Sequence, residues 1–292
     1  MWFYIFITPL FLGILVFSVF PLVYALSMSF TEWDGFTKAK FIGLGNFFRL
    51  AKDVSVGYEL RNTIQYILLV VPTVIILAII LANLLNSSIK GRTIYRTLYY
   101  LPNVTMATAV ATVWRYLLNS DFGIFNKIGQ ALGLPVMKWC SDPKLIMPAI
   151  CLVAIWSSVG YATIMMLAGL QGIPKTYYEA ARIDGANAWH LFFRITIPLL
   201  TPTVFFVLVT NIINGFKQFD LVFMFAGKGN VTSGSGPLID ASRTMVYGIF
   251  YRGFALFEMG YASAEALVLF ALILIVTGIQ FRLQKRWVFY ES

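Results

Sequence analysis

Long apolar segments separated by shorter polar ones account for most of this chain. Six segments each hold the roughly 20 predominantly apolar residues that a helix needs to cross the hydrocarbon core of a bilayer. They cover residues 3–30, 62–86, 98–118, 145–170, 197–225 and 260–281. Apolar and polar residues do not alternate along them as they would in a transmembrane β-strand. We therefore predict an all-α integral membrane protein with six transmembrane helices, forming a single domain over residues 1–292.

The composition supports a membrane location and narrows the choice of partners. Hydrophobic residues make up 59% of the 292 positions, charged residues make up 12%, and the mean hydropathy is +0.77. A net charge of +9 suits a protein that lies beside anionic lipid headgroups. Because the basic residues are scattered between the apolar segments, we expect no nucleic-acid partner. The two cysteines, Cys140 and Cys151, are too few for a disulfide framework.

A polar island between the fourth and fifth apolar segments has the signals of two short helices joined by a turn. Pro174 suits the first helical position, where a missing N–H costs nothing. Gly185 suits the left-handed residue that closes the first helix, and Asn187 can cap the second. The second helix carries Trp189 among other aromatic residues. We predict a rigid protrusion at the membrane surface that a soluble partner could hold.

The same island resembles the EAA loop of permeases from binding-protein-dependent ABC importers. The match is carried by Glu179-Ala180-Ala181, Gly185, Ile195 and Pro198, with Ile197 where leucine is usual. The resemblance implies a type I ABC importer permease fold whose coupling helices, in residues 174–198, dock into a cleft on an ATP-hydrolysing subunit. The residues that would make this coupling are Glu179, Ala180, Ala181, Asp184, Gly185, Ile195 and Pro198. The alternative is a helical hairpin that a Glu179–Arg182 pair merely keeps soluble.

Further segments resemble the carbohydrate-uptake branch of that family, in particular the first permease subunit of maltose-type importers. They are Ser29-Phe30-Thr31, Phe216-Lys217-Gln218-Phe219-Asp220 and Gly260-Tyr261-Ala262-Ser263-Ala264. The resemblance implies a sugar or oligosaccharide substrate and a heterodimer with a second homologous permease. It also implies two cytoplasmic ATP-binding subunits and an extracellular or periplasmic solute-binding protein. ATP and Mg would bind to the partner ATPase subunits, so we expect no cofactor on this chain.

The distribution of basic residues favours both termini on the cytoplasmic side. Loop 90–96 and segment 282–286 contain basic residues and no acid, and the positive-inside rule gives most weight to such short flanks. The resemblance supports this orientation and implies a bacterial or archaeal cytoplasmic membrane. Segments 32–61, 119–144 and 226–259 would then face outward.

The first apolar segment is predicted to be a retained span. Residues 2–31 carry no charge, whereas a cleavable signal peptide has a basic start and a shorter apolar core. The resemblance leads us to expect that a basic cytoplasmic leader, common in the family, is missing before it.

No motif for nucleotide or metal chemistry stands out. The glycine-rich stretch 227–237 invites comparison with a phosphate-binding loop, but Lys228 is followed by Gly229 and no strand precedes it. The single histidine, His190, has no cysteine or carboxylate cluster at ligand spacing, so we expect no metal site. We find no catalytic constellation and no ATP-binding motif. We therefore predict a permease subunit that is not an enzyme and takes its energy from another chain or from an ion gradient.

Polar side chains within the fourth and fifth segments are the candidates for contact with a transported solute. Asn211, Asn214 and Gln218 recur at spacings of three and four, as on one helical face. Amides and hydroxyls with an aromatic ring suit a neutral polyol. The resemblance places Tyr161, Asn211 and Gln218 near the sugar positions of maltose-type permeases, although Gly215 replaces a polar residue there. The alternative is that the amides hold helices together. The full candidate set is Ser157, Ser158, Tyr161, Asn211, Asn214 and Gln218.

Glu265 is the single charged residue within the last apolar segment. At its depth it lies either near the outer headgroups, which we favour, or faces a watery cavity where it could act on substrate or gating. The small residues before it would permit close helix packing.

Other kinds of transporter compete with a sugar permease. The first competing class is a permease for glycerol phosphate or a polyamine. A phosphate substrate would need Arg or Lys in the cavity, and Lys217 is the sole candidate. An ion-coupled secondary transporter or channel is the second. It would be expected to show inverted repeats or broken helices with buried carboxylates, which a single peripheral Glu265 supports poorly. A membrane-embedded enzyme is disfavoured because no acid–base or nucleophile pair falls within a span.

Overall fold

The computed structural model describes residues 2–86, 91–227 and 236–289, and it is mostly helical. Over those residues, five helices are long and apolar enough to cross a membrane. They are Phe6–Met28, Val54–Asn86, Ile146–Gly172, Ala188–Phe216 and Met259–Trp287. The predicted spans 3–30, 62–86, 145–170 and 260–281 correspond to four of them, with shifted ends.

The prediction of residues 98–118 as one helix is wrong. The chain forms α5 (Arg92–Val104) and α6 (Ala107–Leu117), and Thr105 between them is extended with ψ 139°. Pro102 lies near the end of α5 and has no N–H to donate to the preceding turn. The helix therefore ends shortly after the proline, and two shorter helices replace the expected span.

The predicted span 197–225 is also divided. α11 (Ile197–Phe216) is followed by a turn and then by the short helix α12 (Asp220–Phe225). The N–H groups of Lys217 and Gln218 donate to the carbonyls of Asn214 and Gly215, at 3.1 and 3.3 Å. These tighter bonds close the last turn of α11, so Gln218 lies outside the helix.

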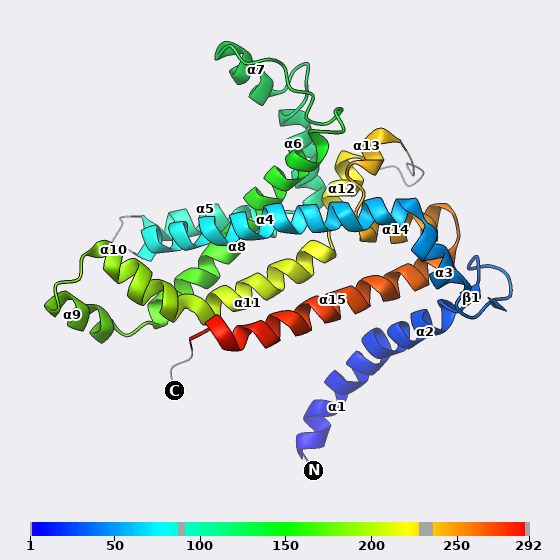
Figure 1. Ribbon diagram of the computed structural model, residues 1–292, viewed down its shortest axis with the longest axis horizontal. Coiled ribbons are helices and arrows are strands. Elements are labelled where there is room, and N and C mark those ends of the chain that lie inside the picture. The colour runs from blue at the N-terminus through cyan, green and yellow to red at the C-terminus, as the bar shows by residue number, and fades with distance from the viewer. Residues whose placement is uncertain (1, 87–90, 228–235, 290–292) are drawn as a thin grey trace.

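The bundle is built from α4 (Val54–Asn86), α8 (Ile146–Gly172), α11 and α15 (Met259–Trp287). α4 packs against both α8 and α11, and α15 packs against α11. Figure 1 shows α4, α11 and α15 running roughly alongside one another. The side chains between them are small or branched and apolar, and Val74, Ala78, Val153 and Val207 are fully buried. Small side chains allow the close helix approach on which packing in a membrane depends.

The first apolar helix stands apart from the rest of the bundle. It consists of α1 (Trp2–Ile14), the π-helical turn η1 (Leu15–Val19) and α2 (Phe20–Met28). No side chain in its apolar window is buried. α2 contacts α15, whereas α1 leaves the bundle (Figure 1).

The two ends of the bundle carry different elements (Figure 1). The first, here the α9 end, holds α9 (Lys175–Ile183), α10 (Ala188–Leu191) and the residues that follow α15. The other, here the hairpin end, holds the antiparallel pair β1 (Thr31–Glu32) and β2 (Lys40–Phe41), together with α3 (Gly45–Lys52), α13 (Pro237–Asp240), α14 (Met245–Phe250) and the π-helical turn η3 (Tyr251–Ala255). The fold is all-α apart from this small sheet.

Two further predictions concern segments between the long helices. The predicted outward segment 119–144 contains α7 (Ile124–Ala131), which projects beyond α6 (Figure 1). Within the glycine-rich stretch 227–237, residues 228–235 lie outside the described residues.

Cys140 and Cys151 are both free thiols.

Candidate functional site

The predicted protrusion is present at the α9 end. α9 ends at Ile183, and Gly185 adopts a left-handed conformation with φ +79°. The N–H of Ala186 reaches back to the carbonyl of Ala181 at 2.9 Å, which closes the helix as a glycine C-cap does. Pro174 lies one position earlier than predicted, because it precedes the first helical residue.

The cap of the second short helix also follows the prediction. The Asn187 side chain accepts a hydrogen bond from the backbone N–H of His190 at 2.9 Å. The ring nitrogen Nδ1 of His190 lies 2.8 Å from the same oxygen. The single histidine of the chain therefore contacts a helix cap.

The second short helix is continuous with the following long helix. α10 spans four residues and leads through the π-helical turn η2 (Phe192–Thr196) directly into α11. The turn ends shortly before Pro198, whose missing N–H cannot complete an ordinary helical ladder. Among the predicted coupling residues, Ile195 and Pro198 thus belong to the start of a long helix.

A hydrogen bond joins the two halves of the protrusion. The Tyr178 hydroxyl on α9 lies 3.1 Å from Oγ1 of Thr196 in η2. Thr196 is buried, and its hydroxyl also contacts the Leu191 carbonyl at 3.1 Å. α9 is therefore anchored to the helix that continues into the bundle.

The outer surface of the protrusion exposes both predicted polar residues and large apolar side chains. Glu179, Ala180, Asp184 and Gly185 are exposed, while Ala181 is half-buried. Ile183 is 87% exposed and Trp189 is 72% exposed. Among the described ion pairs none joins Glu179 to Arg182. Apolar side chains exposed together with polar ones are typical of a surface that binds a partner.

Two neighbouring hollows lie where α5, α8 and α11 meet. Ser157, Ser158 and Gln218 line one of about 140 Å³, and Tyr161 and Asn214 line another of about 350 Å³. Asn103 lines both hollows, so they lie next to each other. The first lies at the break between α5 and α6 and the turn after α11, as expected where irregular backbone borders a cavity in a membrane protein.

Close helix contact fixes the walls of these hollows. Gly160 lies on α8 against α5, where an added Cβ would sit 1.7 Å from the carbonyl oxygen of Tyr99. Only glycine permits the two backbones to approach so closely. Gln218 is held by the Tyr66 hydroxyl, which donates to its Oε1 at 3.1 Å.

The predicted single face of amides on the fifth span is wrong. Asn211 lines neither hollow, and its amide donates to the Val207 carbonyl at 2.8 Å. Gln218 lies beyond the end of α11, so its position is not set by helical spacing. The sequence interpretation missed Asn103, Thr105 and Thr210 as lining residues. The polar pair Asn103 and Thr105 so close to a proline was the available signal.

Glu265 occupies a different environment from the one predicted. It is fully buried inside the protein, and its Oε2 lies 2.7 Å from Nη1 of Arg252. The same guanidinium nitrogen lies 3.0 Å from both carboxylate oxygens of Glu59, which is also buried. The alternative that Glu265 faces a watery cavity is therefore wrong, and its predicted depth near the outer headgroups stays a prediction. These partners come from distant parts of the chain, so no local pattern predicts the cluster.

This cluster of buried charges also removes the sequence-based argument against an ion-coupled transporter. Broken helices and buried carboxylates were named as marks of an ion-coupled transporter, and both features are present in Glu59, Glu265 and the break at Thr105. The two carboxylates pair with Arg252 at the hairpin end, and Glu59 also lies 3.7 Å from Arg243. The class of transporter therefore has to be decided on other grounds.

Comparison with known proteins supplies those grounds. The family model described as "Binding-protein-dependent transport system inner membrane component" matches residues 42–289. The probable ABC transporter permease protein YesP of Bacillus subtilis is 37% identical, over 99% of this chain and 92% of that protein. The sn-glycerol-3-phosphate transport system permease protein UgpA of Brucella abortus is 32% identical, over 99% of this chain and 96% of that protein.

A solved structure agrees on the fold. A chain of a bacterial alginate ABC transporter, in complex with a periplasmic protein carrying alginate pentasaccharide, superposes with a TM-score of 0.80. Its sequence is 21% identical, and the match covers 97% of this chain and 94% of that one. The chain belongs to the binding-protein-dependent transport system inner membrane components, and it is a multi-pass ABC permease subunit whose ATPase is a separate subunit.

Proposed function

We propose that the chain forms the translocation path for a sugar or oligosaccharide delivered by an extracellular or periplasmic solute-binding protein. The observation that carries this proposal is the lining of the two hollows. Amides, hydroxyls and the Tyr161 ring line them, and within the described residues no Lys or Arg does so. Neutral hydrogen-bonding groups with an aromatic surface suit a polyol.

The competing substrates fit this lining less well. A phosphate ester would need a cation to replace its water shell, but Lys217 lines neither hollow and Asp220 would repel the phosphate. A polyamine would need several carboxylates, whereas Asp220 is the single acid in the lining that the structure describes. A relative named for starch degradation products, AmyD of Thermoanaerobacterium thermosulfurigenes, is 27% identical over 98% of this chain and 94% of that protein.

The protrusion is the proposed contact with one of two cytoplasmic ATP-binding subunits, which bind ATP and Mg. Its coupling residues are Glu179, Ala180, Ala181, Asp184, Gly185, Ile195 and Pro198. α9 is anchored to η2 by Tyr178 and Thr196, and η2 is continuous with α11. Force on α9 would therefore move α11, whose later residues Thr210 and Asn214 line a hollow. A second homologous permease would complete the path, and alternating access would follow from rocking of the two permeases.

The proposed orientation places the α9 end in the cytoplasm and the hairpin end outside a bacterial or archaeal cytoplasmic membrane, with both termini cytoplasmic. The segment after α15 is held at the α9 end, because the N–H of Phe289 donates to Oγ1 of Thr201 at 2.9 Å. The domain would comprise the whole of residues 1–292.

A matched pair of variants on α11 tests the substrate path. Asn214 lines a hollow and Asn211 does not, so the same change to leucine can be compared at both positions. In proteoliposomes holding the complete transporter, Asn214→Leu should lower uptake of a labelled sugar and Asn211→Leu should leave it near wild type. A panel of labelled sugars, glycerol phosphate and a polyamine identifies the substrate class. Uptake of glycerol phosphate alone, or equal effects of both variants, would contradict the proposal.

A further inference from the structure

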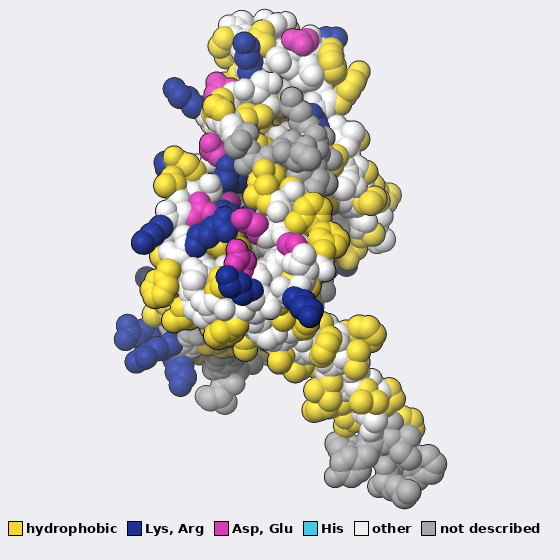
Figure 2. Space-filling view, turned by 90° about the vertical axis from the view of Figure 1, so that its right-hand side faces the viewer, with side chains coloured by type: hydrophobic (Ala, Val, Ile, Leu, Met, Phe, Trp, Pro, Cys, Tyr) yellow, Lys and Arg dark blue, Asp and Glu magenta, His cyan; other side chains and the backbone are white. Residues whose placement is uncertain are grey.

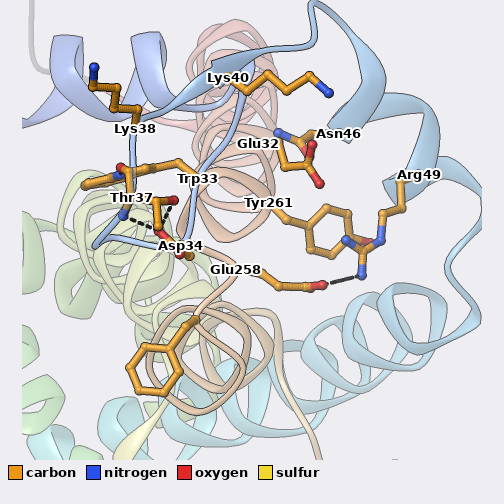
Figure 3. A pocket seen from close by; sticks show the side chains of 11 residues that line it. Glu32, Trp33, Asp34, Thr37, Lys38, Lys40, Asn46, Arg49, Glu258 and Tyr261 are labelled. Atoms are coloured by element: carbon orange, nitrogen blue, oxygen red, sulfur yellow. Dashed lines mark hydrogen bonds and ion pairs between the residues drawn. The ribbon is translucent and has the colours of Figure 1, made fainter.

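The hairpin end carries charges of both signs, and one of its hollows is balanced in charge. Figure 2 views this end and shows acidic side chains lying among basic ones. Figure 3 shows a hollow of about 390 Å³ between the β1–β2 hairpin, α3 and the start of α15, where Arg49 pairs with Glu258 at 2.9 Å. Its described lining holds three acids and three bases, so it favours neither an anion nor a cation.

A second hollow at this end lies between the first turns of α4 and the start of α8. It has a volume of about 460 Å³, and Asp240 at the end of α13 completes its wall. Arg61 and Gln65 line it from α4, and Lys144 lines it just before α8 begins. No described residue lines both this hollow and the hollows of the proposed sugar path. It is therefore a separate feature of the molecule.

Hydrogen bonds hold the walls of this second hollow in place. Asn62 is buried on α4, and its amide donates to the carbonyls of Asp240 and Arg243 at 2.9 and 3.0 Å. At the next position of α4, Oγ1 of Thr63 accepts the N–H of Met245 at 3.1 Å. The segment after α13 is thus fixed to α4, and the hollow needs no rearrangement to receive a ligand.

The charges of this second hollow favour an anion. Arg61 and Lys144 are both exposed, and neither takes part in the ion pairs of the described residues. Asp240 is the single acid in the described lining, and its carboxylate pairs with Arg243. Asp142 lies outside the lining, and its Oδ1 accepts the backbone N–H of Lys144 at 2.8 Å. Two cations therefore remain for a ligand, and both Arg and Lys bind phosphate oxygens.

The two cations stand where polar chain gives way to apolar chain. Arg61 directly precedes the apolar segment 62–86, and Lys144 directly precedes the apolar segment 145–170. Long basic side chains at the ends of membrane spans place their charges at the depth of the lipid headgroups. Tyr58 also lines the hollow, and tyrosine is enriched at the same depth. The hollow is therefore level with the phosphate groups of one leaflet.

Exposed leucines continue the hollow toward the middle of the bundle. Leu68 follows the lining residue Gln65 by three positions on α4, and it is 66% exposed. Leu152 follows the lining residue Pro148 by four positions on α8, and it is 42% exposed. Residues three or four apart share a face of a helix. An anion site with apolar side chains one turn deeper suits a molecule that has a charged head and an acyl chain.

We propose that this hollow binds the phosphate group of an anionic phospholipid, between Arg61 and Lys144, with an acyl chain along Leu68 and Leu152. The lipid belongs to the leaflet at the hairpin end. A zwitterionic phospholipid fits less well, because the cationic nitrogen of its headgroup would be repelled by two cations. A soluble phosphate ester has no chain to cover the exposed leucines. The bound lipid would join the first turns of α4 to the residues that lead into α8.

The test counts the lipid molecules that the complete transporter retains in detergent, by native mass spectrometry. The transporter is supplied with dioleoyl phosphatidylglycerol or dioleoyl phosphatidylcholine, which differ in headgroup charge and share the same chains. Arg61→Gln/Lys144→Gln is compared with Lys38→Gln/Lys40→Gln, which removes two charges from exposed lysines at the same end and outside the second hollow. We expect the first pair to lose one bound phosphatidylglycerol relative to wild type and the second pair to lose none.

A third variant separates charge from shape. Arg61→Lys/Lys144→Arg keeps both cations and should retain the phosphatidylglycerol that Arg61→Gln/Lys144→Gln loses. Elution of each variant as the assembled complex shows that it is folded. Equal retention by all three variants, or loss from all three, overturns the inference. Retention of phosphatidylcholine by wild type in equal number overturns the choice of an anionic lipid. Displacement of the lipid by soluble glycerol phosphate would identify a free phosphate site instead, and would likewise overturn it.

Discussion

Arg252 and Glu265 form a buried ion pair, with Nη1 of the arginine 2.7 Å from Oε2 of the glutamate. The arginine lies on η3 and the glutamate on α15, and Glu59 of α4 contacts the same guanidinium nitrogen at 3.0 Å. One side chain thus joins three elements of the hairpin end. Among the described ion pairs, removing it would leave the buried Glu265 without a counter-charge and would leave Glu59 with Arg243 at 3.7 Å.

Arg252→Ala is expected to be strongly destabilising. Loss of one partner from a buried ion pair costs about 3–5 kcal/mol, and among the described ion pairs Glu265 has Arg252 as its single partner. The free energy of unfolding of the purified subunit in detergent should fall by that order. Glu258→Gln breaks the exposed pair with Arg49 and should cost less than about 1 kcal/mol. Equal losses for the two variants would show that the cluster does not stabilise the fold.

Asp53 should make stability depend on pH in the acid range. Partial burial opposes ionisation, but hydrogen bonds from the Tyr261 hydroxyl and the Ser55 N–H, with the Arg252 charge, hold the pKa of Asp53 below its ordinary 3.8. A lowered pKa stabilises the folded state above the unfolded value, and this stabilisation is lost as pH falls through the folded value. Asp53→Asn should therefore melt at a lower temperature than wild type at neutral pH. The difference should begin to shrink below about pH 4 and close as pH falls through the lowered folded value; a constant difference across pH would contradict this assignment.

Gly185→Ala should uncouple ATP hydrolysis from transport. Gly185 has φ +79°, where a Cβ costs about 1–2 kcal/mol, so the turn between α9 and α10 would change shape. We expect sugar uptake to fall while basal ATP hydrolysis by the complex persists. Gly172→Ala is the matched control, because an added Cβ there meets open space at an ordinary φ. Normal uptake by Gly185→Ala would argue against a rigid coupling protrusion.

The contact between Tyr178 and Thr196 should act as a mechanical tether. Tyr178→Phe and Thr196→Val each remove the 3.1 Å hydrogen bond, and each should lower the number of sugar molecules moved per ATP. The double variant should lose little more than the worse single variant, since the same interaction is removed. Additive losses would mean that the two hydroxyls act independently.

The sequence predicted the protrusion better than the hollows. The protrusion depends on contacts between residues a few positions apart, whereas the hollows depend on contacts between distant helices. Gly185 and Asn187 act on their own backbone turns, so residue type and spacing suffice to predict them. The hollow depends on where helices break and cross. Asn211 was predicted to share a face with Gln218, but the turn after Phe216 removes Gln218 from that face. A helical periodicity cannot anticipate such a break.

The sequence by itself determined the membrane character, the long helices and the family motif, because hydropathy, caps and turns are local properties of the chain. The tertiary structure alone decided that Arg252 is paired with Glu265 and Glu59, and that Arg61 and Lys144 border a preformed hollow. Glu59 and Arg252 are separated by 193 positions. Burial makes such charges costly unless they are paired, and only the fold, which places Arg252 of η3 between Glu59 of α4 and Glu265 of α15, brings the partners together.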